Sequence, residues 1–384
     1  MKYLVLGSGM MGSAVAYDLA KRNPQDEVQL GDINIAHAKT TAQAIGENVR
    51  PMRVDVNNTR ELVGAMTGNN VVISAVSYSV NHQITRAALQ AGVHMVDLGG
   101  NNEVVQKQLG HDAEAKAKGI TVIPNCGLAP GLINILAMHG TREFDRLDSV
   151  HLRVGGLPQN PRPPLYYQIV FSVEGLINEY VERAEVIRDG KLEHIDPMSG
   201  LEDIHFPEPF GVLEAFNTSG GLSRLTHILN GKVRNLDYKT IRYKGHCEKF
   251  KTLLDLGFAT SEPMMVGGSV KTNREFFADL LRKKLDHGDK DAVLARATIT
   301  GNRNGAEKTL VYEFTDYYDD HAQMTAMMRT TAFPTSIIAQ MVACEGIQER
   351  GVLLPELCVP GDAFIDELGK RNIRITKRIT EIWS

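Results

Sequence analysis

The residues best suited to chemistry lie in one short segment, KTIRYKGHCEK, at positions 239–249. An arginine such as Arg242 can bind a carboxylate through two parallel hydrogen bonds. His246 falls at the expected start of a helix, where the helix dipole disfavours imidazolium, so we expect a neutral ring that can accept a proton. Thr240 shares a strand face with Arg242 because strand side chains alternate. The segment predicts a site that binds an anion and moves a proton.

Other side chains are candidates for the same site. Glu214 is a carboxylate in an apolar setting, LEAF, where burial without a partner would be costly, so a substrate ammonium is one partner that we consider. Asp97 ends the apolar run VHMVD and is the second candidate for a general base after His246. Tyr167 and Thr240 are weaker candidates for substrate contacts.

Each of these candidates also has a plain structural role that the sequence leaves open. A strand arginine such as Arg242 commonly forms a structural ion pair, and a histidine at a helix start commonly acts as a cap. Asp97 has the alternative of capping the end of a strand. The sequence therefore leaves the base open between His246 and Asp97.

A glycine-rich turn near the N-terminus indicates a second kind of site. LVLGSGMMG places three glycines between an apolar run and a helical stretch. Gly7 permits a tight turn, Gly9 a close approach to a pyrophosphate, and Gly12 close packing of helix against strand. The amides that open the helix, those of Met10 and Met11, would face the phosphates. The turn predicts dinucleotide binding; a glycine-rich turn in an unrelated α/β domain is the alternative.

Asp32 indicates which dinucleotide is bound. It follows the apolar run Glu27–Leu30 and lies 20 residues after Gly12, the spacing of the acid that binds the adenosine ribose hydroxyls. Its charge would repel a 2′-phosphate, and no Lys or Arg follows until Lys39. We therefore expect the cofactor to be NAD rather than NADP.

Alternating strands and helices must position these residues. Apolar runs typical of strands lie at 2–6, 27–30, 51–56, 71–75, 93–98 and 120–124, with helical stretches at 36–45, 59–66, 81–91 and 102–118 between them. This order predicts an α/β fold with a doubly wound parallel Rossmann sheet. Ligands bind beyond the carboxyl ends of such strands, so four more residues become expected cofactor contacts: Asp55, Ser74, Ala75 and Val76.

The pattern changes after residue 125. Short alternating runs over residues 150–320 predict an α+β domain with a mixed or antiparallel sheet, including a hairpin of Val293–Gly301 and Glu307–Phe314 joined by residues 302–305. Residues 323–343 predict a helix. We expect an NAD-binding Rossmann domain at 1–128, a substrate-binding α+β domain at 129–322, and a helical segment at 323–384 that returns to the Rossmann domain.

The amino-acid composition limits the classes of binding partner and cofactor that we expect. The 384 residues include 42 Lys and Arg and 46 Asp and Glu, a net charge of −4, which gives no support to a nucleic-acid or anionic-membrane partner. The four cysteines form no CxxC pair, so no metal is expected, and Cys126 and Cys247 are expected to be core residues rather than nucleophiles. Neither a signal peptide nor a membrane span is indicated, and we expect a cytoplasmic protein.

Seven segments together resemble the saccharopine dehydrogenase-like family, and within it its lysine-oxidising members. They are LGSGMMG (6–12), VDLGG (96–100), NCGLAPGLIN (125–134), VGGLPQNPRPP (154–164), VFSVEGL (170–176), EAFNTSGG (214–221) and KTIRYKGHCEK (239–249). The resemblance implies that the α+β domain also supports oligomerisation, as a homodimer or homotetramer. The family often has Asp where this chain has Asn125, so the role of that acid would be weakened here or moved to Asp97.

The activity that the resemblance implies is oxidative deamination of L-lysine at its ε-amino group by NAD⁺, giving 2-aminoadipate 6-semialdehyde and ammonia. Arg242 would bind the α-carboxylate and Glu214 the α-ammonium. A base is needed, His246 or Asp97, because hydride leaves carbon only when the neighbouring nitrogen has a free lone pair.

Two other functions stay open at this point. One is a saccharopine or carboxynorspermidine dehydrogenase, which acts on a secondary amine with an additional carboxylate and would need a second arginine, from among Arg153, Arg162 and Arg224. The other is a non-catalytic NAD-binding protein. The presence of Arg242, His246 and Glu214 together counts against the second of these.

Overall fold

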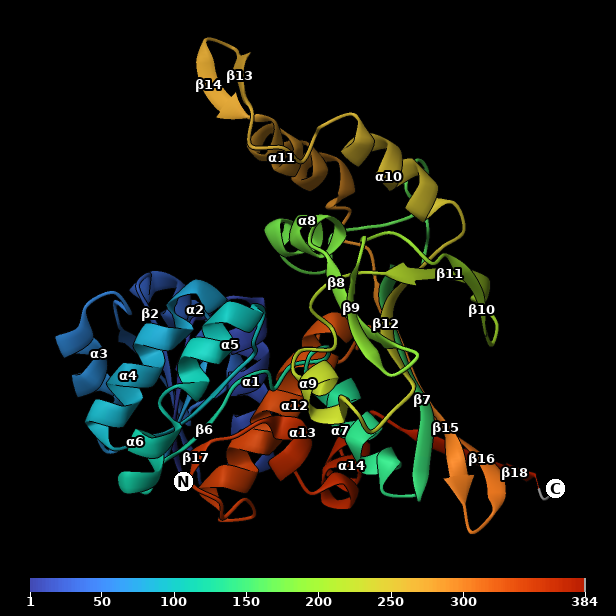
Figure 1. The fold of residues 1–384 in the computed structure, drawn as a ribbon. Helices are drawn as coiled ribbons and strands as arrows, with labels where there is room; N and C mark the ends of the chain where they lie inside the picture. The colour runs from blue at the N-terminus through green and yellow to red at the C-terminus, as the bar shows by residue number, and fades with distance from the viewer. Residues whose placement is uncertain (383–384) are drawn as a thin grey trace. The chain divides into compact units, whose positions relative to one another are not determined.

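The computed structural model describes residues 1–382, apart from the side chains of Val266 and Ser269 (Figure 1). The chain forms two compact units. Unit 1 comprises Met1–His139 and Met328–Ile375, and unit 2 comprises Gly140–Met327 and the residues from Thr376 onward. This division differs from the expected boundary at residue 128, and it splits the expected helical tail between the two units.

Unit 1 contains a parallel sheet of seven strands in the order β17-β6-β5-β4-β1-β2-β3. This order reverses between β1 and β4, the arrangement of a doubly wound sheet, and it confirms the expected Rossmann-like fold. Six of the strands are those that the apolar runs predicted. The seventh, β17, has two residues and is too short for any sequence pattern. The strands are β1 (Lys2–Leu6), β2 (Glu27–Asp32), β3 (Val49–Arg53), β4 (Val71–Ser74), β5 (His94–Asp97), β6 (Thr121–Ile123) and β17 (Gly351–Val352).

Helices follow most strands of unit 1. The expected single helix at 102–118 is two helices, α5 and α6, because the backbone turns at Gly110 and His111. The helices and one 3₁₀ turn are α1 (Met10–Arg22), α2 (Ile35–Ile45), α3 (Thr59–Met66), η1 (Tyr78–Val80), α4 (Asn81–Ala91), α5 (Asn102–Leu109), α6 (Asp112–Ala117), α7 (Leu132–Thr141, whose last two residues belong to unit 2), α12 (Ala326–Ala343, whose first two residues belong to unit 2), α13 (Pro355–Cys358) and α14 (Gly361–Gly369).

A buried ion pair fastens the later part of the chain to α1. The Asp18 carboxylate accepts hydrogen bonds from Ser336 Oγ at 2.6 Å and from Arg371 Nε at 2.9 Å. Asp18 and Arg371 are almost fully buried, so neither charge could be left without the other. Residues 328–375 therefore complete unit 1.

Unit 2 is built on a mixed sheet, which confirms the expected α+β architecture. The main path is β10-β11-β12-β7-β15-β16-β18, with β8 paired to β12 and β9 to β8. Among the described strands of unit 2, only β12 and β7 pair in parallel. The strands are β7 (Arg146–Pro158), β8 (Ala184–Arg188), β9 (Lys191–Ile195), β10 (Glu202–Phe206), β11 (Gly211–Asn217), β12 (Asn235–Arg242), β15 (Asp291–Arg303), β16 (Ala306–Tyr317) and β18 (Thr376–Ile382).

The predicted hairpin is present as β15 and β16, with a shorter loop than expected. Pairing continues to Arg303 and Ala306, so the loop is Asn304-Gly305 alone. Both loop residues have positive φ, 51° and 85°, which is the conformation of a type I′ turn.

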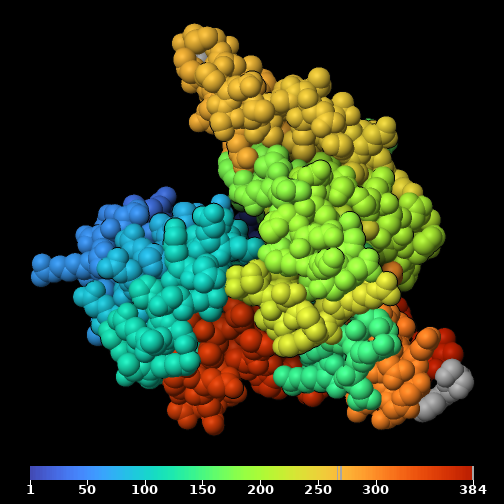
Figure 2. Space-filling model, in the orientation of Figure 1, coloured from blue at the N-terminus to red at the C-terminus, as the bar shows by residue number. Residues whose placement is uncertain are grey.

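Helices and a small hairpin complete unit 2. They are α8 (Val173–Val181), α9 (Leu225–Leu229), α10 (His246–Asp255), α11 (Asn273–Leu285) and the hairpin of β13 (Pro263–Val266) and β14 (Ser269–Thr272). The gold surface of α11 and this hairpin projects from the green surface of the same unit (Figure 2). In the described residues, every helix is too short or too polar to span a lipid bilayer.

Candidate active site

Arg242 is the last residue of β12 and is 2% exposed. Its Nε donates to the Tyr180 hydroxyl at 2.9 Å and its Nη1 to the Ile241 carbonyl at 2.8 Å. The guanidinium carbon lies 4.7 Å from the ring centre of Tyr167. Within residues 1–382, no carboxylate oxygen lies within 4 Å of this guanidinium. A buried cation without a counter-ion is costly, so this position is suited to receive an anion.

His246 is fully buried at the start of α10, after Gly245 turns the chain with a φ of +84°. Its Nδ1 lies 2.9 Å from the Leu165 carbonyl and its Nε2 lies 3.1 Å from the Tyr180 hydroxyl. Because a carbonyl can only accept, Nδ1 carries the proton and Nε2 accepts from Tyr180. Burial, aided by the charge of Arg242, lowers the pKa of His246 to about 3. The ring is therefore neutral, as expected, but both of its nitrogens are engaged.

Tyr180 joins Arg242 to His246, and our sequence reasoning missed it. Its hydroxyl accepts from Arg242 and donates to His246. A signal was present, because Val173, Leu176, Ile177 and Tyr180 recur at helical spacing and form the buried face of α8. A buried tyrosine normally finds a hydrogen-bond partner, so Tyr180 could have been assigned to a polar cluster.

Tyr167 and Thr240 lie near this cluster. The Tyr167 ring meets the His246 ring at 5.4 Å between centroids and lies against Arg242. Burial raises the pKa of Tyr167 to about 12. Thr240 is buried, and its hydroxyl is 2.7 Å from that of Thr218. The structure thus brings Arg242, His246 and Tyr167 together, with Thr240 one pleat away from Arg242 on the same strand face.

Glu214 has a partner other than the substrate ammonium that we considered. Its carboxylate accepts from the Gly245 amide at 2.8 Å and from the Cys247 amide at 2.6 Å. Helix N-termini carry unpaired N–H groups and a partial positive charge, which stabilise a carboxylate there. The cost of burying Glu214 is thus met by α10 itself, and the carboxylate fixes the start of that helix; a role in holding a substrate ammonium stays a prediction.

Asp97 lies in unit 1 and is fully buried at the end of β5. It accepts hydrogen bonds from the Gly99 amide at 2.8 Å, the Gln108 side chain at 2.7 Å and the Asn125 amide at 3.3 Å. Burial raises the pKa of its carboxyl despite these bonds. Asp97 therefore holds the loops after β5 and β6 together. The buried thiols of Cys126 and Cys247 have raised pKa values too, as core cysteines do.

The glycine-rich turn after β1 has the form that a dinucleotide requires. A Cβ on Gly12 would lie 1.9 Å from the Gly7 carbonyl, whereas a Cβ on Gly9 would meet no atom within 4 Å. Gly7 has a φ of +97°, and a Cβ there would lie 2.8 Å from the carbonyl of Ala75. No side chain caps α1, so the amides of Met10 and its neighbours stay available for a phosphate.

Asp32 lies at the end of β2, beside this turn. Its Oδ2 accepts from the Ser8 amide at 2.8 Å and hydroxyl at 2.7 Å, and its Oδ1 accepts from the Asn34 amide at 2.8 Å. Burial acts to raise the pKa of Asp32, but these hydrogen bonds outweigh it and the pKa is lowered. The carboxylate is therefore anionic and half-buried, as a ribose-binding acid should be.

The remaining expected cofactor contacts differ in what their side chains do. Ser74 is buried, and its hydroxyl donates to Asn81 at 2.7 Å. Ser74 can therefore offer a ligand its backbone but not its hydroxyl, while Ala75 and Val76 after it are partly exposed at the end of β4. Asp55 is half-buried after β3 and accepts from the Asn57 amide at 2.9 Å.

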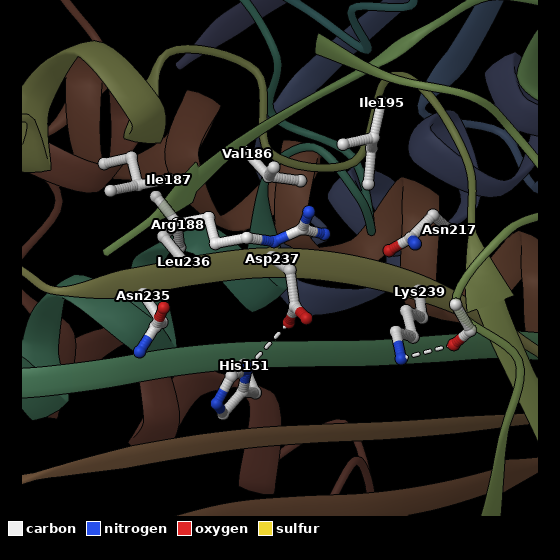
Figure 3. Close-up of a pocket in the computed structure, with 11 residues that line it drawn as sticks. His151, Val186, Ile187, Arg188, Ile195, Asn217, Asn235, Leu236, Asp237 and Lys239 are labelled. Carbon is white, nitrogen blue, oxygen red and sulfur yellow. Dashed lines mark hydrogen bonds and ion pairs between the residues drawn. The ribbon is translucent and has the colours of Figure 1, made fainter. Parts of the chain in front are cut away.

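A polar cluster occupies the opposite face of β12 in unit 2. It lines a cavity of about 170 Å³ in which Asp237 is bonded to His151 and Lys239 to the Gly200 carbonyl (Figure 3). Arg153 pairs there with Asp237 at 2.7 Å and with Glu202 at 2.5 Å. Asp237 and Lys239 alternate along the strand with the residues of the Arg242 face, so this cluster is separate from that site.

Comparison with known proteins assigns the family. Residues 3–123 match the model of the saccharopine dehydrogenase NADP binding domain, and residues 127–373 match the model of the saccharopine dehydrogenase C-terminal domain. The chain therefore belongs to the saccharopine dehydrogenase family, and unit 1 holds its nucleotide-binding dehydrogenase domain.

Individual relatives are distant. Saccharopine dehydrogenase [NADP(+), L-glutamate-forming] of Saccharomyces cerevisiae is 26% identical over 264 residues, which are 66% of this chain and 57% of that protein. The Schizosaccharomyces pombe protein of the same name is 23% identical over 98% of this chain and 99% of its own. The apo structure of the S. cerevisiae enzyme has a TM-score of 0.83, with 20% identity and 99% of each chain covered. The chain thus spans little more than half of one relative and nearly all of another.

Proposed function

We propose that this protein is an oxidoreductase of the L-lysine 6-dehydrogenase type, which oxidises L-lysine at its ε-amino group with NAD⁺ and releases 2-aminoadipate 6-semialdehyde and ammonia. The observation that carries the proposal is the buried guanidinium of Arg242, bonded to a hydroxyl and a carbonyl but, within residues 1–382, to no carboxylate. The α-carboxylate of an amino acid supplies the missing anion in the paired geometry that arginine favours.

Unit 1 would hold the dinucleotide. The turn from Gly7 to Gly12 and the uncapped start of α1 would take the pyrophosphate, and Asp32 the adenosine ribose. When bound, NAD⁺ accepts the hydride from the carbon that carries the ε-nitrogen. We propose NAD rather than NADP because the anionic carboxylate of Asp32 would face a 2′-phosphate.

The ε-ammonium must lose a proton before oxidation, and His246 is poorly placed to take it. The lone pair on its Nε2 already accepts from Tyr180, and its pKa of about 3 makes it a weak base. We therefore give His246 a positioning role, in which it fixes Tyr180 and, through Tyr180, the guanidinium of Arg242. Of the two candidate bases, Asp97 keeps that assignment, because burial raises the pKa of its carboxyl and so makes it a stronger base than an ordinary aspartate.

A saccharopine or carboxynorspermidine dehydrogenase would need a second cation for the additional carboxylate. Two of the three arginines considered for it already have acidic partners: Arg153 pairs with Asp237, and Arg162 pairs with Asp289 at 2.8 Å. Arg224 is half-buried and remains the position on which this alternative depends. The loss of two candidates favours a substrate with one carboxylate, and so favours lysine.

The test is NADH formation with a panel of amines. Purified protein is supplied with NAD⁺ or NADP⁺ and with lysine, ornithine, saccharopine or a diamine at alkaline pH. We expect NADH from lysine, no gain on adding 2-oxoglutarate, and loss of activity in Arg242→Met. Absorbance that rises with saccharopine alone, and falls in Arg224→Met, would favour the secondary-amine function. No NADH with lysine would end the proposal.

A further inference from the structure

The cavity beside β12 has no part in the proposed function. It lies within unit 2, against the face of β12 that is opposite to Arg242, and its volume is about 170 Å³ (Figure 3). A cavity of about 150 Å³ can hold a molecule as large as benzene. Apolar side chains, among them Val186 and Ile195, line it together with a few polar ones, which is the usual composition of a ligand site.

Asn217 gives this cavity a hydrogen-bond acceptor without a partner. The residue ends β11 and is 4% exposed. Its Nδ2 donates to the Ser199 carbonyl at 3.0 Å, and this bond fixes the orientation of the amide because a carbonyl can only accept. Its Oδ1 is buried and, within residues 1–382, accepts no hydrogen bond. An unpaired buried acceptor lowers stability, so this oxygen is suited to a donor from a ligand.

Lys239 is a buried cation next to this acceptor. It pairs with Asn217 across β11 and β12, so the two side chains stand side by side on one face of the sheet. Its Nζ donates to the Gly200 carbonyl and to the Glu202 carboxylate, each at 2.6 Å. An ammonium has three N–H groups, so among the described contacts one donor of Lys239 is left for a ligand.

Arg188 supplies a second cation, from the end of β8. Its guanidinium extends over the cavity, and the oxygen of the Asn217 amide is turned toward it (Figure 3). Its ion pair is with Glu193 at 3.4 Å, a residue outside the cavity lining. Surface pairs of this kind are weak, so the guanidinium can turn to an anion in the cavity.

The remaining charges of the cluster neutralise one another. Asp237 is held by His151 and Arg153, each at 2.7 Å, and Glu202 is shared by Arg153 and Lys239. Two carboxylates therefore balance Arg153 and Lys239, and the charge of Arg188 comes in addition. This balance favours an anionic ligand over a cationic one.

We propose that the cavity binds a small carboxylate with a hydrogen-bond donor on the neighbouring carbon, which is an α-amino or α-hydroxy acid with a short apolar side chain. The carboxylate accepts from Arg188 and from the remaining N–H of Lys239, and the neighbouring donor pairs with Asn217 Oδ1. Water alone would satisfy Asn217 but would gain nothing from Val186 and Ile195, whereas an aliphatic side chain is stabilised there. The site is separate from Arg242 and does not depend on the proposed function.

Three probes of one shape test the role of Asn217 without changing a buried residue. L-Valine carries an ammonium beside its carboxylate, L-2-hydroxy-3-methylbutanoate carries a hydroxyl there, and 3-methylbutanoate carries no donor. In calorimetric titration of the full chain we expect the tighter of the first two to bind at least about 10-fold more tightly than 3-methylbutanoate, which leaves Asn217 Oδ1 unpaired. Equal affinity for all three would overturn the proposal, and so would the absence of saturable binding, which would leave the cavity to water.

Two arginine variants locate the binding. Arg188→Gln removes the cation over the cavity, and Arg183→Gln is the matched control, because Arg183 lies just before β8, is equally exposed and also pairs with a carboxylate at 3.4 Å, but does not line the cavity. Arg188→Gln should raise the Kd of the tighter probe about 10-fold, and Arg183→Gln should leave it unchanged. Binding that Arg188→Gln leaves intact would place the probe elsewhere, for example at Arg242, and would overturn the proposal.

Discussion

Glu214 offers the sharpest test of how the structure differs from the sequence expectation. If its partner is the N-terminus of α10, replacing it lowers stability and leaves substrate selection alone. If its partner is a substrate ammonium, replacing it weakens substrate selection and leaves stability unchanged. The change to make is Glu214→Gln, which keeps the size of the side chain and one carbonyl oxygen but removes the charge.

The expected loss of stability follows from the two bonds. Hydrogen bonds to charged groups contribute about 1.5–3 kcal/mol each, and a charge at a helix terminus roughly 0.3–1 kcal/mol more. The glutamine carbonyl can still accept from one of the two amides, at 2.8 Å from Gly245 or 2.6 Å from Cys247, but its NH₂ group then points at the other amide. One charged bond and the interaction with the helix dipole are lost, so unfolding free energy should fall by ~2–4 kcal/mol.

Urea unfolding followed by circular dichroism measures this loss, and we expect a midpoint lower by about 1 M. The control is Glu248→Gln, an exposed residue in the first turn of the same helix, whose removal should change the midpoint little. The ratio of kcat/KM for lysine over 6-aminohexanoate, which is lysine without its α-ammonium, should be the same in native protein and Glu214→Gln. A variant of native stability whose ratio falls to one would refute the helix-capping role and restore the ammonium role.

Three further predictions concern proton linkage and the cofactor turn. An imidazole titrates at about 6.5 in the unfolded chain and at a pKa of about 3 in folded His246, so protonation favours unfolding and stability falls by about 1.4 kcal/mol per pH unit below 6.5. The stability difference between native protein and His246→Gln should therefore narrow between about pH 7 and 4, and a constant difference would contradict a neutral buried ring. Asp32→Asn, which keeps an acceptor but loses the charge, should raise the NADP⁺ to NAD⁺ ratio of kcat/KM by ~10–100-fold, and an unchanged ratio would mean that the charge does not select the cofactor. Gly9→Ala should fold with native stability but weaken NADH binding, which fluorescence measures. Gly12→Ala should lower stability, because its Cβ would lie 1.9 Å from the Gly7 carbonyl oxygen. Native NADH affinity in Gly9→Ala would count against the pyrophosphate assignment.

The fold of unit 1 was predictable because its signals are local. Each strand is an apolar run that a helical stretch follows, and the glycine turn fixes where the sheet begins. The strand β17 was not predictable, since Gly351–Val352 has no periodicity and is a strand only because β6 lies beside it. The split of the tail has the same cause: β18 is exposed along its whole length and is a strand only through its pairing with β16.

The candidate site was predictable only where its residues are neighbours in sequence. Arg242 and His246 are four residues apart, on a strand and a helix joined by the three residues 243–245, so their proximity followed from the pattern. Tyr180 comes from a helix about 60 residues earlier, and no spacing rule links it to β12. The partners of Glu214 are two backbone amides about 30 residues away, and backbone groups leave no mark in a side-chain pattern.

The hydrogen bonds around Arg242 have a direction, and that direction explains why a buried histidine belongs there. The Leu165 carbonyl can only accept, so His246 must donate from Nδ1 and accept at Nε2; Tyr180 must then donate to His246, which leaves its oxygen lone pairs for Arg242 Nε. Each bond thus determines the next, and the guanidinium is oriented before any substrate arrives. Protonation of His246 would turn Nε2 into a donor, reverse Tyr180 and set its hydroxyl hydrogen against Arg242. A ring with a pKa of about 3 stays neutral under physiological conditions, so burial of His246 keeps Arg242 in place.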